Sequence, residues 1–455
     1  MKKIIVIGGG PAGYPAALKA ASLGAQVTLV EKNKLGGVCL NCGCIPSKSL
    51  LDAAHRFGGL QALAVLGNEN APAAANSLFE SRDFTKMQAR QQAATAKLTQ
   101  GISFLLKKAG VTVVQGTASF QDEQTVFVQT PQGTQTLNAD GVIIAAGTEA
   151  FYPPPFDALK GKIYDNSTIF SMPALPRSLA IVGGGVIGCE MADLFSALGV
   201  DVHLIELQPR LLPLEDENAV RTLNQAFVKR GIKIHTGVSA TAAVQTENSF
   251  EITLSSGEKI QTETVLAAIG RSADLTDLHL ENIGVAWTRK GVTVNPQTLQ
   301  VKNNIYAAGD ITGLCLLAHA ATRQGETAAS NLCGVPATYH NERVPRAIYT
   351  APEIAAVGLS RTQAQAQGIA VKAHKTFFLA NGRAVAQGQT EGYVEWLSDA
   401  QSGKLLGVCL VGAQASELVH VAAVALEAGF TVTQFQQVIF AHPTLAESVW
   451  EAAFK

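Results

Sequence analysis

The stretch from Lys3 to Gly13 reads KIIVIGGGPAG, and this pattern decides the fold. Its apolar beginning, Lys3 to Ile7, predicts a buried parallel strand. Gly8, Gly10 and Gly13 follow at once with the spacing GxGxxG, and a helix is predicted after them. Glycines in this context allow a tight turn, the close approach of a pyrophosphate, and close packing of helix on strand.

A second predicted strand, Gln26 to Val30, ends at Glu31. Glu31 follows Gly13 by 18 residues (31 − 13 = 18). A carboxylate at that distance accepts hydrogen bonds from the hydroxyls of an adenosine ribose. The N-terminal region therefore predicts an α/β unit that binds a dinucleotide.

The same pattern returns in the middle of the chain. An apolar run beginning at Ser178 leads into Gly183, Gly185 and Gly188, and the next predicted strand ends at Glu206. The spacing repeats as well, since 206 − 188 = 18. Two such units imply two dinucleotides, and an enzyme that passes electrons between them is the economical interpretation.

Glu206 bears on the choice of the second dinucleotide. If the second unit binds a nicotinamide dinucleotide, a carboxylate there would repel the 2′-phosphate of NADP, and the sequence then favours NAD. Arg210 is close enough in sequence to leave this preference open.

Between Gly36 and Lys48 the chain reads GGVCLNCGCIPSK, with Cys39 and Cys44 five positions apart. A regular helix would separate the two sulfurs by about 140°, so a bridge needs a distorted first turn. Pro46 suits the first turn of a helix, and a thiolate just upstream would feel the positive helix end. The pattern favours a redox pair. A pair of buried thiols, or a metal site that also uses Cys42, is the alternative, although no fourth ligand at zinc spacing lies nearby.

This segment, GGxCLNxGCIPSK, resembles the signature of the flavoprotein disulfide reductases, in the form typical of dihydrolipoamide dehydrogenases. The resemblance implies that Cys39 exchanges with substrate and that Cys44 lies against a flavin. It also implies that Lys48 and Glu190 form a pair beside that flavin. Relatives usually carry valine where this chain has Cys42, so we expect a Cys39–Cys44 bridge with Cys42 free.

The resemblance extends over essentially all 455 residues and implies how the chain is divided. It implies an FAD-binding domain at 1–148, an NAD-binding domain at 149–270, a central segment at 271–343 that completes the FAD site, and a dimerisation domain at 344–455. The expected fold class is α/β, with two Rossmann-like domains and a C-terminal α+β domain. Further implied FAD contacts are Gly116, Gly147, Asp310 and Ala318, and further implied NAD contacts are Val238 and Gly270.

Local patterns add detail to this division. Residues 84–108 predict one long amphipathic helix, and residues 71–75 (APAAA) a small loop. Beyond Val344, short predicted strands alternate with helices, which is an α+β layer rather than a third nucleotide unit. The strands predicted there are Arg346–Tyr349, Val371–Phe378, Tyr393–Ser398 and Leu405–Val411. Ser360 and Gln363 form a capping box for one of these helices.

The segment His442-Pro443-Thr444-Leu445-Ala446-Glu447 predicts a general base. Pro443 moves His442 out of helical geometry, and Glu447 is placed to accept a hydrogen bond from the imidazole. Alone, a histidine before a helix is more often structural. The family resemblance implies that His442 and Glu447 act on the disulfide of a partner subunit, so that a homodimer completes the site.

Composition bounds the remaining possibilities. The net charge of −1 argues against nucleic acid as a partner, and no apolar run approaches the ~18 residues of a membrane span. The seven cysteines are not spaced as a secreted disulfide framework, so we expect a reducing compartment, the cytoplasm.

The sequence therefore predicts a homodimeric FAD enzyme that oxidises dihydrolipoamide with NAD. Its expected partners are the lipoyl domains of a 2-oxoacid dehydrogenase or glycine-cleavage complex. One alternative is another FAD-dependent reductase of a disulfide or a metal ion. However, glutathione reductases usually read CVPKK where this chain reads CIPSK, and the C-terminus VWEAAFK lacks the cysteine pair of mercuric reductases. A redox sensor or scaffolding subunit without turnover is the alternative of a different class.

Overall fold

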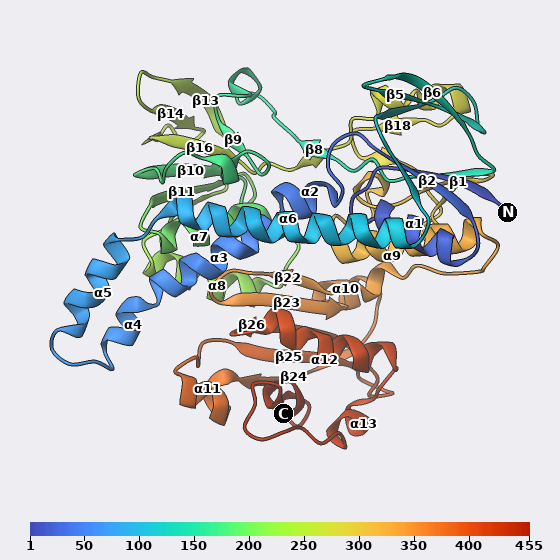
Figure 1. Cartoon of the computed structure of the whole chain (residues 1–455). Coiled ribbons are helices and arrows are strands. Elements are labelled where there is room, and N and C mark those ends of the chain that lie inside the picture. The colour runs from blue at the N-terminus through green and yellow to red at the C-terminus, as the bar shows by residue number, and fades with distance from the viewer.

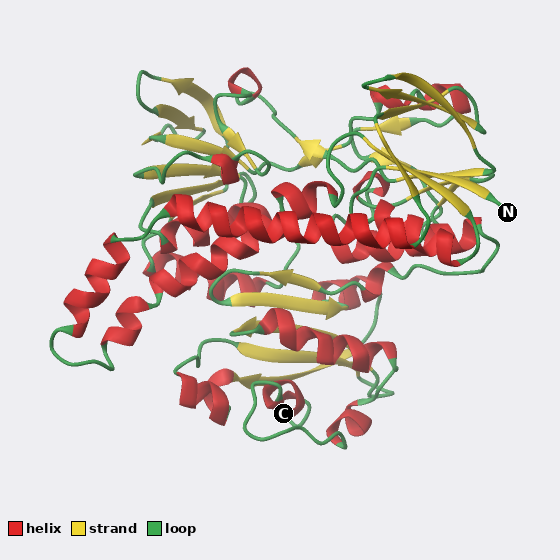
Figure 2. Ribbon diagram, viewed as in Figure 1, coloured by secondary structure: helices red, strands yellow, loops and turns green.

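The computed structural model describes residues 1–455, except for the side chain of Gln61. Two sheets lie side by side in the upper part of Figure 1, and a third lies below them. A layer of helices, dominated by the long α6 (Phe84–Lys108), separates the upper sheets from the lower one, as Figure 2 shows. This arrangement confirms the predicted α/β fold with a C-terminal α+β region, and α6 has the predicted bounds.

The first sheet has the strand order β20-β21-β7-β1-β2-β3. It is parallel except for the β20–β21 pair, and its central strands are buried on both faces, which explains their apolar runs. Its strands are β1 (Lys3–Ile7), β2 (Gln26–Glu31), β3 (Thr112–Gln115), β7 (Gly141–Ile144), β20 (Gln300–Lys302) and β21 (Ile305–Ala307). The antiparallel strands β4 (Thr117–Phe120), β5 (Thr125–Thr130) and β6 (Gly133–Asn138) form a separate sheet beside it.

The second sheet, ordered β12-β11-β10-β16-β9, repeats this plan. Its strands are β9 (Tyr164–Asp165), β10 (Ser178–Val182), β11 (Asp201–Glu206), β12 (Lys233–Thr236) and β16 (Thr264–Ala267). An antiparallel sheet again accompanies it, formed by β13 (Ala240–Gln245), β14 (Phe250–Leu254) and β15 (Lys259–Thr262). The two halves meet at a short antiparallel pair, β8 (Glu149–Ala150) with β17 (Arg271–Ser272).

The helices between the sheets carry the cysteine segment. That segment forms α2 (Gly37–Cys42) and α3 (Cys44–Gly58), and α3 packs against both α6 and α7 (Val186–Ala197). Helix α1 (Gly13–Ser22) packs along α9 (Ala318–Leu332), and α8 (Glu217–Lys229) follows β11.

One prediction in this region is wrong. Residues 71–75, predicted as a loop, begin α5 (Ala71–Glu80), which forms a hairpin with α4 (Leu60–Ala64) that projects at the left of Figure 1. Alanine has the highest helix propensity, and the proline lies in the first turn, where its missing N–H is harmless. The proline was therefore a helix-start signal.

The lower sheet is antiparallel, in the order β22-β23-β26-β25-β24. Its strands are β22 (Arg346–Ile348), β23 (Glu353–Gly358), β24 (Val371–Phe377), β25 (Tyr393–Asp399) and β26 (Leu405–Gly412), and its helices are α10 (Arg361–Ala366), α11 (Gly382–Gln387), α12 (Ala415–Glu427), α13 (Val432–Gln436) and α14 (Glu447–Ala452). The Ser360–Gln363 capping box is confirmed. Strand β23 was missed, because its alanines give a weak strand signal.

No helix among the described residues is long and apolar enough to cross a membrane.

Two glycines in long helices should respond oppositely to an added methyl group. A Cβ at Gly325 in α9 would lie 2.1 Å from the carbonyl oxygen of Ala12, so Gly325→Ala must separate α9 from α1. We expect it to destabilise the protein by about 1–3 kcal/mol. A Cβ at Gly101 in α6 meets nothing within 4 Å, so Gly101→Ala should stabilise by about 0.5–1 kcal/mol.

Circular dichroism melting of the protein measures both effects. A melting temperature for Gly325→Ala at or above that of the unmodified chain would contradict the close α1–α9 packing.

Candidate active site

The first and third glycines of each GxGxxG motif are required by the backbone itself. Gly8 and Gly183 have φ values of 102° and 108°, which disfavour any larger residue. A Cβ at Gly13 would lie 1.8 Å from the carbonyl oxygen of Gly8, and a Cβ at Gly188 would lie 1.8 Å from that of Gly183. The two turns therefore have the same construction.

The middle glycine of each motif is not required by the protein. A Cβ at Gly10 would have only an ordinary contact, 3.7 Å from the Cα of Gly37, and a Cβ at Gly185 would meet nothing within 4 Å. The space in front of these residues is open at the start of a helix, where backbone N–H groups favour an anion. Both turns thus fit a pyrophosphate.

Each strand-ending glutamate is held in place by two backbone N–H groups. Glu31 accepts 2.6 Å hydrogen bonds from the backbone N–H of Gly9 and from that of the residue two positions after Glu31 itself. Glu206 likewise accepts 2.6 Å hydrogen bonds from the N–H of Gly184 and from that of the residue two positions after Glu206. Because each carboxylate oxygen has a second lone pair, both can still accept from a ribose. Their geometry fits a ribose diol in both units.

The implied FAD contact Gly116 and the implied NAD contact Val238 also occupy equivalent places. The N–H of Gly116 donates to the carbonyl oxygen of Glu31 at 3.0 Å, and that of Val238 to the carbonyl oxygen of Glu206 at 3.3 Å. Gly147 follows β7 and Gly270 follows β16, with φ values of 72° and 127° and open space in front of them. All four lie towards the carboxyl ends of parallel strands, the edge at which ligands bind in such sheets.

Asp310 lies where the two halves of the chain meet. Its Oδ2 accepts a 2.8 Å hydrogen bond from the Thr148 hydroxyl and lies 3.7 Å from Nε of Arg271. Arg271 is nearly buried and also donates to Thr148 and to Oδ1 of Asn166. Arg271 was not among the predicted site residues, although its place directly after Gly270 could have suggested it.

The turn before Asp310 is held by α9, which begins at Ala318. Gln324 of that helix is fully buried, and its Oε1 accepts from the N–H of Gly309 at 2.8 Å and from the Thr312 hydroxyl at 3.3 Å. Sequence reasoning missed Gln324, because nothing in the local pattern marks a partner 15 residues away.

The cysteine pair is brought together by a break between two helices. Cys39 lies within α2, and Cys44 is the first residue of α3. Gly43 separates them with φ −141° and ψ −111°, and a Cβ there would come within 3.0 Å of the Val38 carbonyl oxygen. This break between two helices places the two free thiols within hydrogen-bonding reach.

The two thiols differ in acidity because of this contact. The hydrogen bond from Cys39 and the positive charge of Lys48, acting against burial, lower the pKa of Cys44 to about 7. The same hydrogen bond, with burial, raises the pKa of Cys39. Near neutral pH the proton therefore stays on Cys39, and Cys44 becomes a thiolate.

Lys48 is paired with Glu190 across the two units. Its Nζ lies 2.7 Å from Oε2 of Glu190, which is 3% exposed on α7. The other oxygen, Oε1, accepts from the backbone N–H of Tyr349 at 3.2 Å. The pair therefore joins α3, α7 and the lower domain at one point.

Cys42, at the end of α2, faces a different neighbour. Its pKa is raised by burial, in part offset by a hydrogen bond with Ser167 and by the charge of Arg271. A half-buried thiol whose partner is Ser167 is a poor nucleophile near neutral pH.

His442 and Glu447 lie in the lower domain, His442 between α13 and α14 and Glu447 at the start of α14. Nδ1 of His442 is 2.9 Å from Oε1 of Glu447, whose other oxygen accepts from the Thr444 N–H at 2.7 Å. Although burial raises it, the pKa of Glu447 is held below its usual value by these two hydrogen bonds. The His442 side chain is 78% exposed.

Within one chain the structure does not bring this pair to the cysteines. The segment between α13 and α14 lies at the bottom of Figure 1, whereas α2 and α3 lie above the lower sheet.

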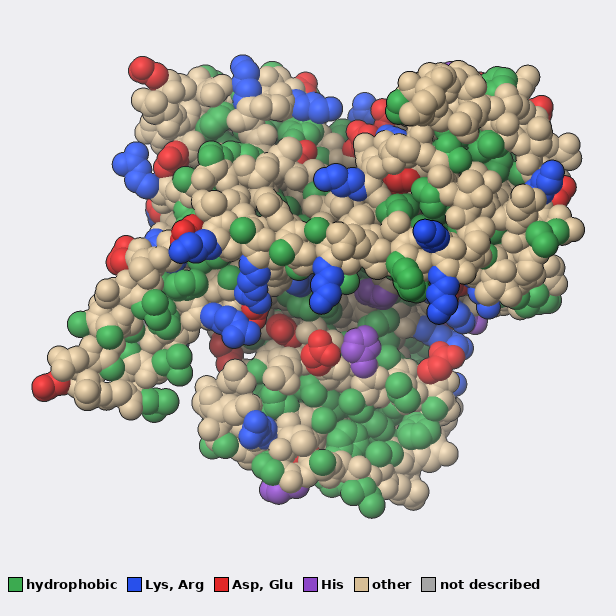
Figure 3. All heavy atoms as spheres, in the orientation of Figure 1, with side chains coloured by type: hydrophobic (Ala, Val, Ile, Leu, Met, Phe, Trp, Pro, Cys, Tyr) green, Lys and Arg blue, Asp and Glu red, His purple; other side chains and the backbone are tan. Residues whose placement is uncertain are grey.

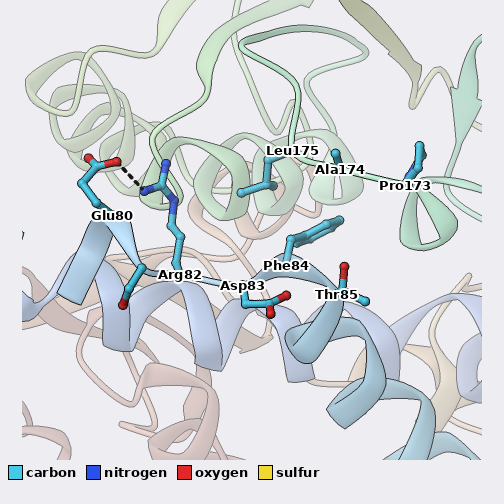
Figure 4. Close-up of a pocket in the computed structure, with 9 residues that line it drawn as sticks. Glu80, Arg82, Asp83, Phe84, Thr85, Pro173, Ala174 and Leu175 are labelled. Carbon is cyan, nitrogen blue, oxygen red and sulfur yellow. Dashed lines mark ion pairs between the residues drawn. The ribbon is translucent and has the colours of Figure 1, made fainter. Parts of the chain in front are cut away.

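An open groove with a volume of about 480 Å³ lies elsewhere (Figure 4). It contains an ion pair of 3.6 Å between Glu80 and Arg82, and none of the predicted site residues. Its lining comes from the α5–α6 junction and the segment before β10: residues 80–85 and 173–175. We assign it no part in the chemistry.

Two dinucleotide cradles beside a pair of thiols define an oxidoreductase that exchanges electrons between a dithiol and dinucleotides. The family described as pyridine nucleotide-disulphide oxidoreductase matches residues 2–325, and its dimerisation domain matches residues 344–453. The chain belongs to this family.

Similar proteins match this chain over nearly its full length. The dihydrolipoyl dehydrogenase of Bacillus subtilis is 40% identical over 452 residues, which is 99% of this chain and 97% of that protein. That of Geobacillus stearothermophilus is 35% identical, with coverage of 99% and 95%. Among solved structures, LpdA from Mycobacterium tuberculosis has a TM-score of 0.92 at 28% identity, covering 100% of this chain and 99% of that one. The HOCl-induced flavoprotein disulfide reductase RclA from Escherichia coli, in a Cu(II) complex, has a TM-score of 0.88 at 25% identity and the same coverage.

The acidity of Cys44 gives a direct test of this geometry. In the reduced protein, the ultraviolet absorbance of thiolate should titrate with a midpoint near pH 7. The thiolate forms as the pH rises through that value and is lost below it. Cys44→Ser should remove this titration, whereas Cys42→Val should leave it in place. Loss of the titration in Cys42→Val but not in Cys44→Ser would transfer the thiolate to Cys42 and contradict the assignment.

Proposed function

We propose that this chain oxidises dihydrolipoyl groups to lipoyl groups with NAD, through a redox-active disulfide and FAD. The observation that carries the proposal is the dithiol at Cys39 and Cys44, of unequal acidity and held beside the Lys48–Glu190 pair that links the two units. Full-length similarity to curated dihydrolipoyl dehydrogenases supports the same activity.

We assign FAD to the first unit, residues 1–148 with 271–343, and NAD to the second, residues 149–270. In support, β20 and β21 of the central segment complete the first sheet. The FAD-binding residues would be Gly8, Gly10, Gly13, Glu31, Lys48, Gly116, Gly147, Asp310 and Ala318. The NAD-binding residues would be Gly183, Gly185, Gly188, Glu206, Val238 and Gly270. When bound, FAD accepts an electron pair and NAD carries it away as hydride.

The protein's own residues carry out the thiol exchange. His442 takes the proton of one substrate thiol, and the resulting thiolate attacks the sulfur of Cys39 in the Cys39–Cys44 disulfide. The S–S bond breaks, and Cys44 leaves as a thiolate stabilised by Lys48. The second substrate thiol attacks the substrate sulfur of the mixed disulfide and gives its proton to the departing Cys39, which releases oxidised substrate. The first proton stays on His442. One substrate dithiol is oxidised as one enzyme disulfide is reduced.

A homodimer supplies the base in this proposal. The chain carries the family's dimerisation domain, and the surface of that domain is apolar around α12, as Figure 3 shows. Val424 of α12 is 70% exposed, and Ile439, three residues before His442, is 96% exposed. Because an exposed apolar patch on a soluble protein marks an interaction site, we infer that this face packs on a second copy. His442 would then reach the disulfide of the partner subunit.

Cellular context follows from the chemistry. A working dithiol suits a reducing compartment, so we propose the cytoplasm, with protein-bound lipoyl domains as the substrate carriers.

Steady-state assay tests the activity and the nucleotide choice together. The protein should reduce NAD with dihydrolipoamide, and its kcat/KM should be clearly higher for NAD than for NADP, because Glu206 repels a 2′-phosphate. Glu206→Ala should narrow that difference. Cys39→Ser, which keeps both nucleotide units, is the inactive control. NADP used as well as NAD would contradict the role of Glu206, and no turnover with either would contradict the function.

Mixing two inactive variants tests the dimer. Homodimers of Cys44→Ala and of His442→Ala should each lack activity, and after subunit exchange the heterodimer should recover part of it. Each heterodimer would contain one site with both an intact disulfide and an intact base. If heterodimers confirmed by mass remain inactive, the base acts within one chain and this arrangement is wrong.

A further inference from the structure

The turn between β22 and β23 reaches the redox pair from the lower domain. Figure 1 shows these two strands directly below α3 and α7. Tyr349, Thr350 and Ala351 form the start of the turn, and Thr350 is buried. None of these residues belongs to a nucleotide-binding motif, yet the turn lies against the helices that carry Lys48 and Glu190.

Two buried carboxylates on one face of α7 hold the backbone of this turn. Glu190 accepts from the N–H of Tyr349 at 3.2 Å, and Asp193, three residues further along the helix, accepts from the N–H of Ala351 at 3.3 Å. Asp193 is fully buried and is itself bonded to His55 of α3 and Arg230. Nη2 of Arg230 donates in addition to the Ala351 carbonyl oxygen at 2.7 Å. Hydrogen bonds to the N–H of Tyr349 and to the N–H and carbonyl oxygen of Ala351 therefore fix the backbone that carries the Tyr349 ring.

The ring of Tyr349 lies against the lysine of the redox pair. Nζ of Lys48 lies 4.4 Å from the ring centroid and 2.7 Å from Oε2 of Glu190. The ammonium is thus held between a carboxylate and the negative face of an aromatic ring. Such a cation–π contact is favourable, and more so when the cation is partly desolvated.

The groups around Cys44 decide how strongly Lys48 can stabilise the Cys44 thiolate. Cys44 is influenced by Cys39 of α2, by Lys48 of α3 and by Glu190 of α7. Of the two charged side chains, Lys48 favours the thiolate and Glu190 opposes it. Burial, with Glu190, Glu353, Glu417 and Cys44 nearby, raises the pKa of Tyr349, so the phenol stays neutral. The ring therefore places the cation without adding charge of its own.

We propose that Tyr349 is a positioning residue, whose ring face holds the Lys48 ammonium where it stabilises the Cys44 thiolate. This inference rests on the proposed function for its catalytic meaning, since Cys44 is the thiolate that the exchange reaction forms. It concerns the ring and not the hydroxyl. It also makes the acidity of the redox pair depend on a turn of the dimerisation domain.

Substitutions that keep or remove the ring separate this role from a structural one. The measurement is made on FAD-loaded dimers carrying Cys39→Ser, whose hydroxyl can replace the Cys39 hydrogen bond. The pH dependence of thiolate ultraviolet absorbance is compared with that of the same protein carrying Cys44→Ser as well. The difference isolates Cys44 and needs no lipoyl substrate, so it is informative even if the proposed function fails.

Tyr349→Phe should leave the midpoint of Cys44 unchanged, because the ring remains. Tyr349→Leu and Tyr349→Met should both move it to higher pH by roughly half a unit, because the ammonium is no longer held in place. Two apolar replacements are used so that a folding defect in one does not decide the result. Phe377→Leu is the matched control. It removes a ring 5.4 Å from Nζ of Lys375 in the same domain, on an exposed side chain, and should have no effect on Cys44.

Dimer mass, FAD content and melting temperature are recorded for every variant, so that a shift is read only from folded protein. An unchanged midpoint in folded Tyr349→Leu and Tyr349→Met would overturn the proposal. An equal shift in Tyr349→Phe would also overturn it, because the effect would then belong to the hydroxyl. A shift in Phe377→Leu would show a general response to lost aromatic contacts and would overturn it too.

Discussion

The ion pair between Lys48 and Glu190 is the constraint on which the rest of the arrangement depends. Glu190 is 3% exposed, and its partner lies 2.7 Å away on a helix of the other dinucleotide unit. A buried charge is tolerated only when it is paired and hydrogen-bonded, and removing one partner costs about 3–5 kcal/mol. The pair therefore fixes α3 against α7 in one register. Since Cys44 begins α3, the same contact sets where the thiol lies relative to both cradles.

The repetition of the dinucleotide unit explains why so much of the fold could be predicted. Turn, glutamate and helix lie close together in the sequence, and each is dictated by local sterics. Gly8 and Gly183 need positive φ, and the glutamate that ends the second strand of each unit accepts from an equivalent backbone N–H in its glycine turn. A pattern that is both local and repeated can be read without knowing the rest of the chain.

The contacts that could not be predicted are those between distant segments. Arg271 with Asp310, Gln324 with Gly309, and Asp193 with His55 join residues on different elements, and no local spacing marks such pairs. The errors in secondary structure have the opposite cause, because there a local signal was read wrongly. Residues 71–75 are helical because alanine favours a helix and proline is tolerated in its first turn. Strand β23 lacks the β-branched run that would have identified it.

The unequal acidity of the two thiols gives a direction to the exchange chemistry. A disulfide is attacked most readily at the sulfur whose partner is the better leaving group, and the thiol of lower pKa leaves faster. Cys44 begins α3 at the positive end of its dipole and lies near the positive charge of Lys48. It is therefore the better leaving group, and an incoming thiolate should attack Cys39. The family resemblance implies the same order, which also follows from the place of Cys44 at the start of α3 and from the charge of Lys48. These two features determine which sulfur meets the substrate.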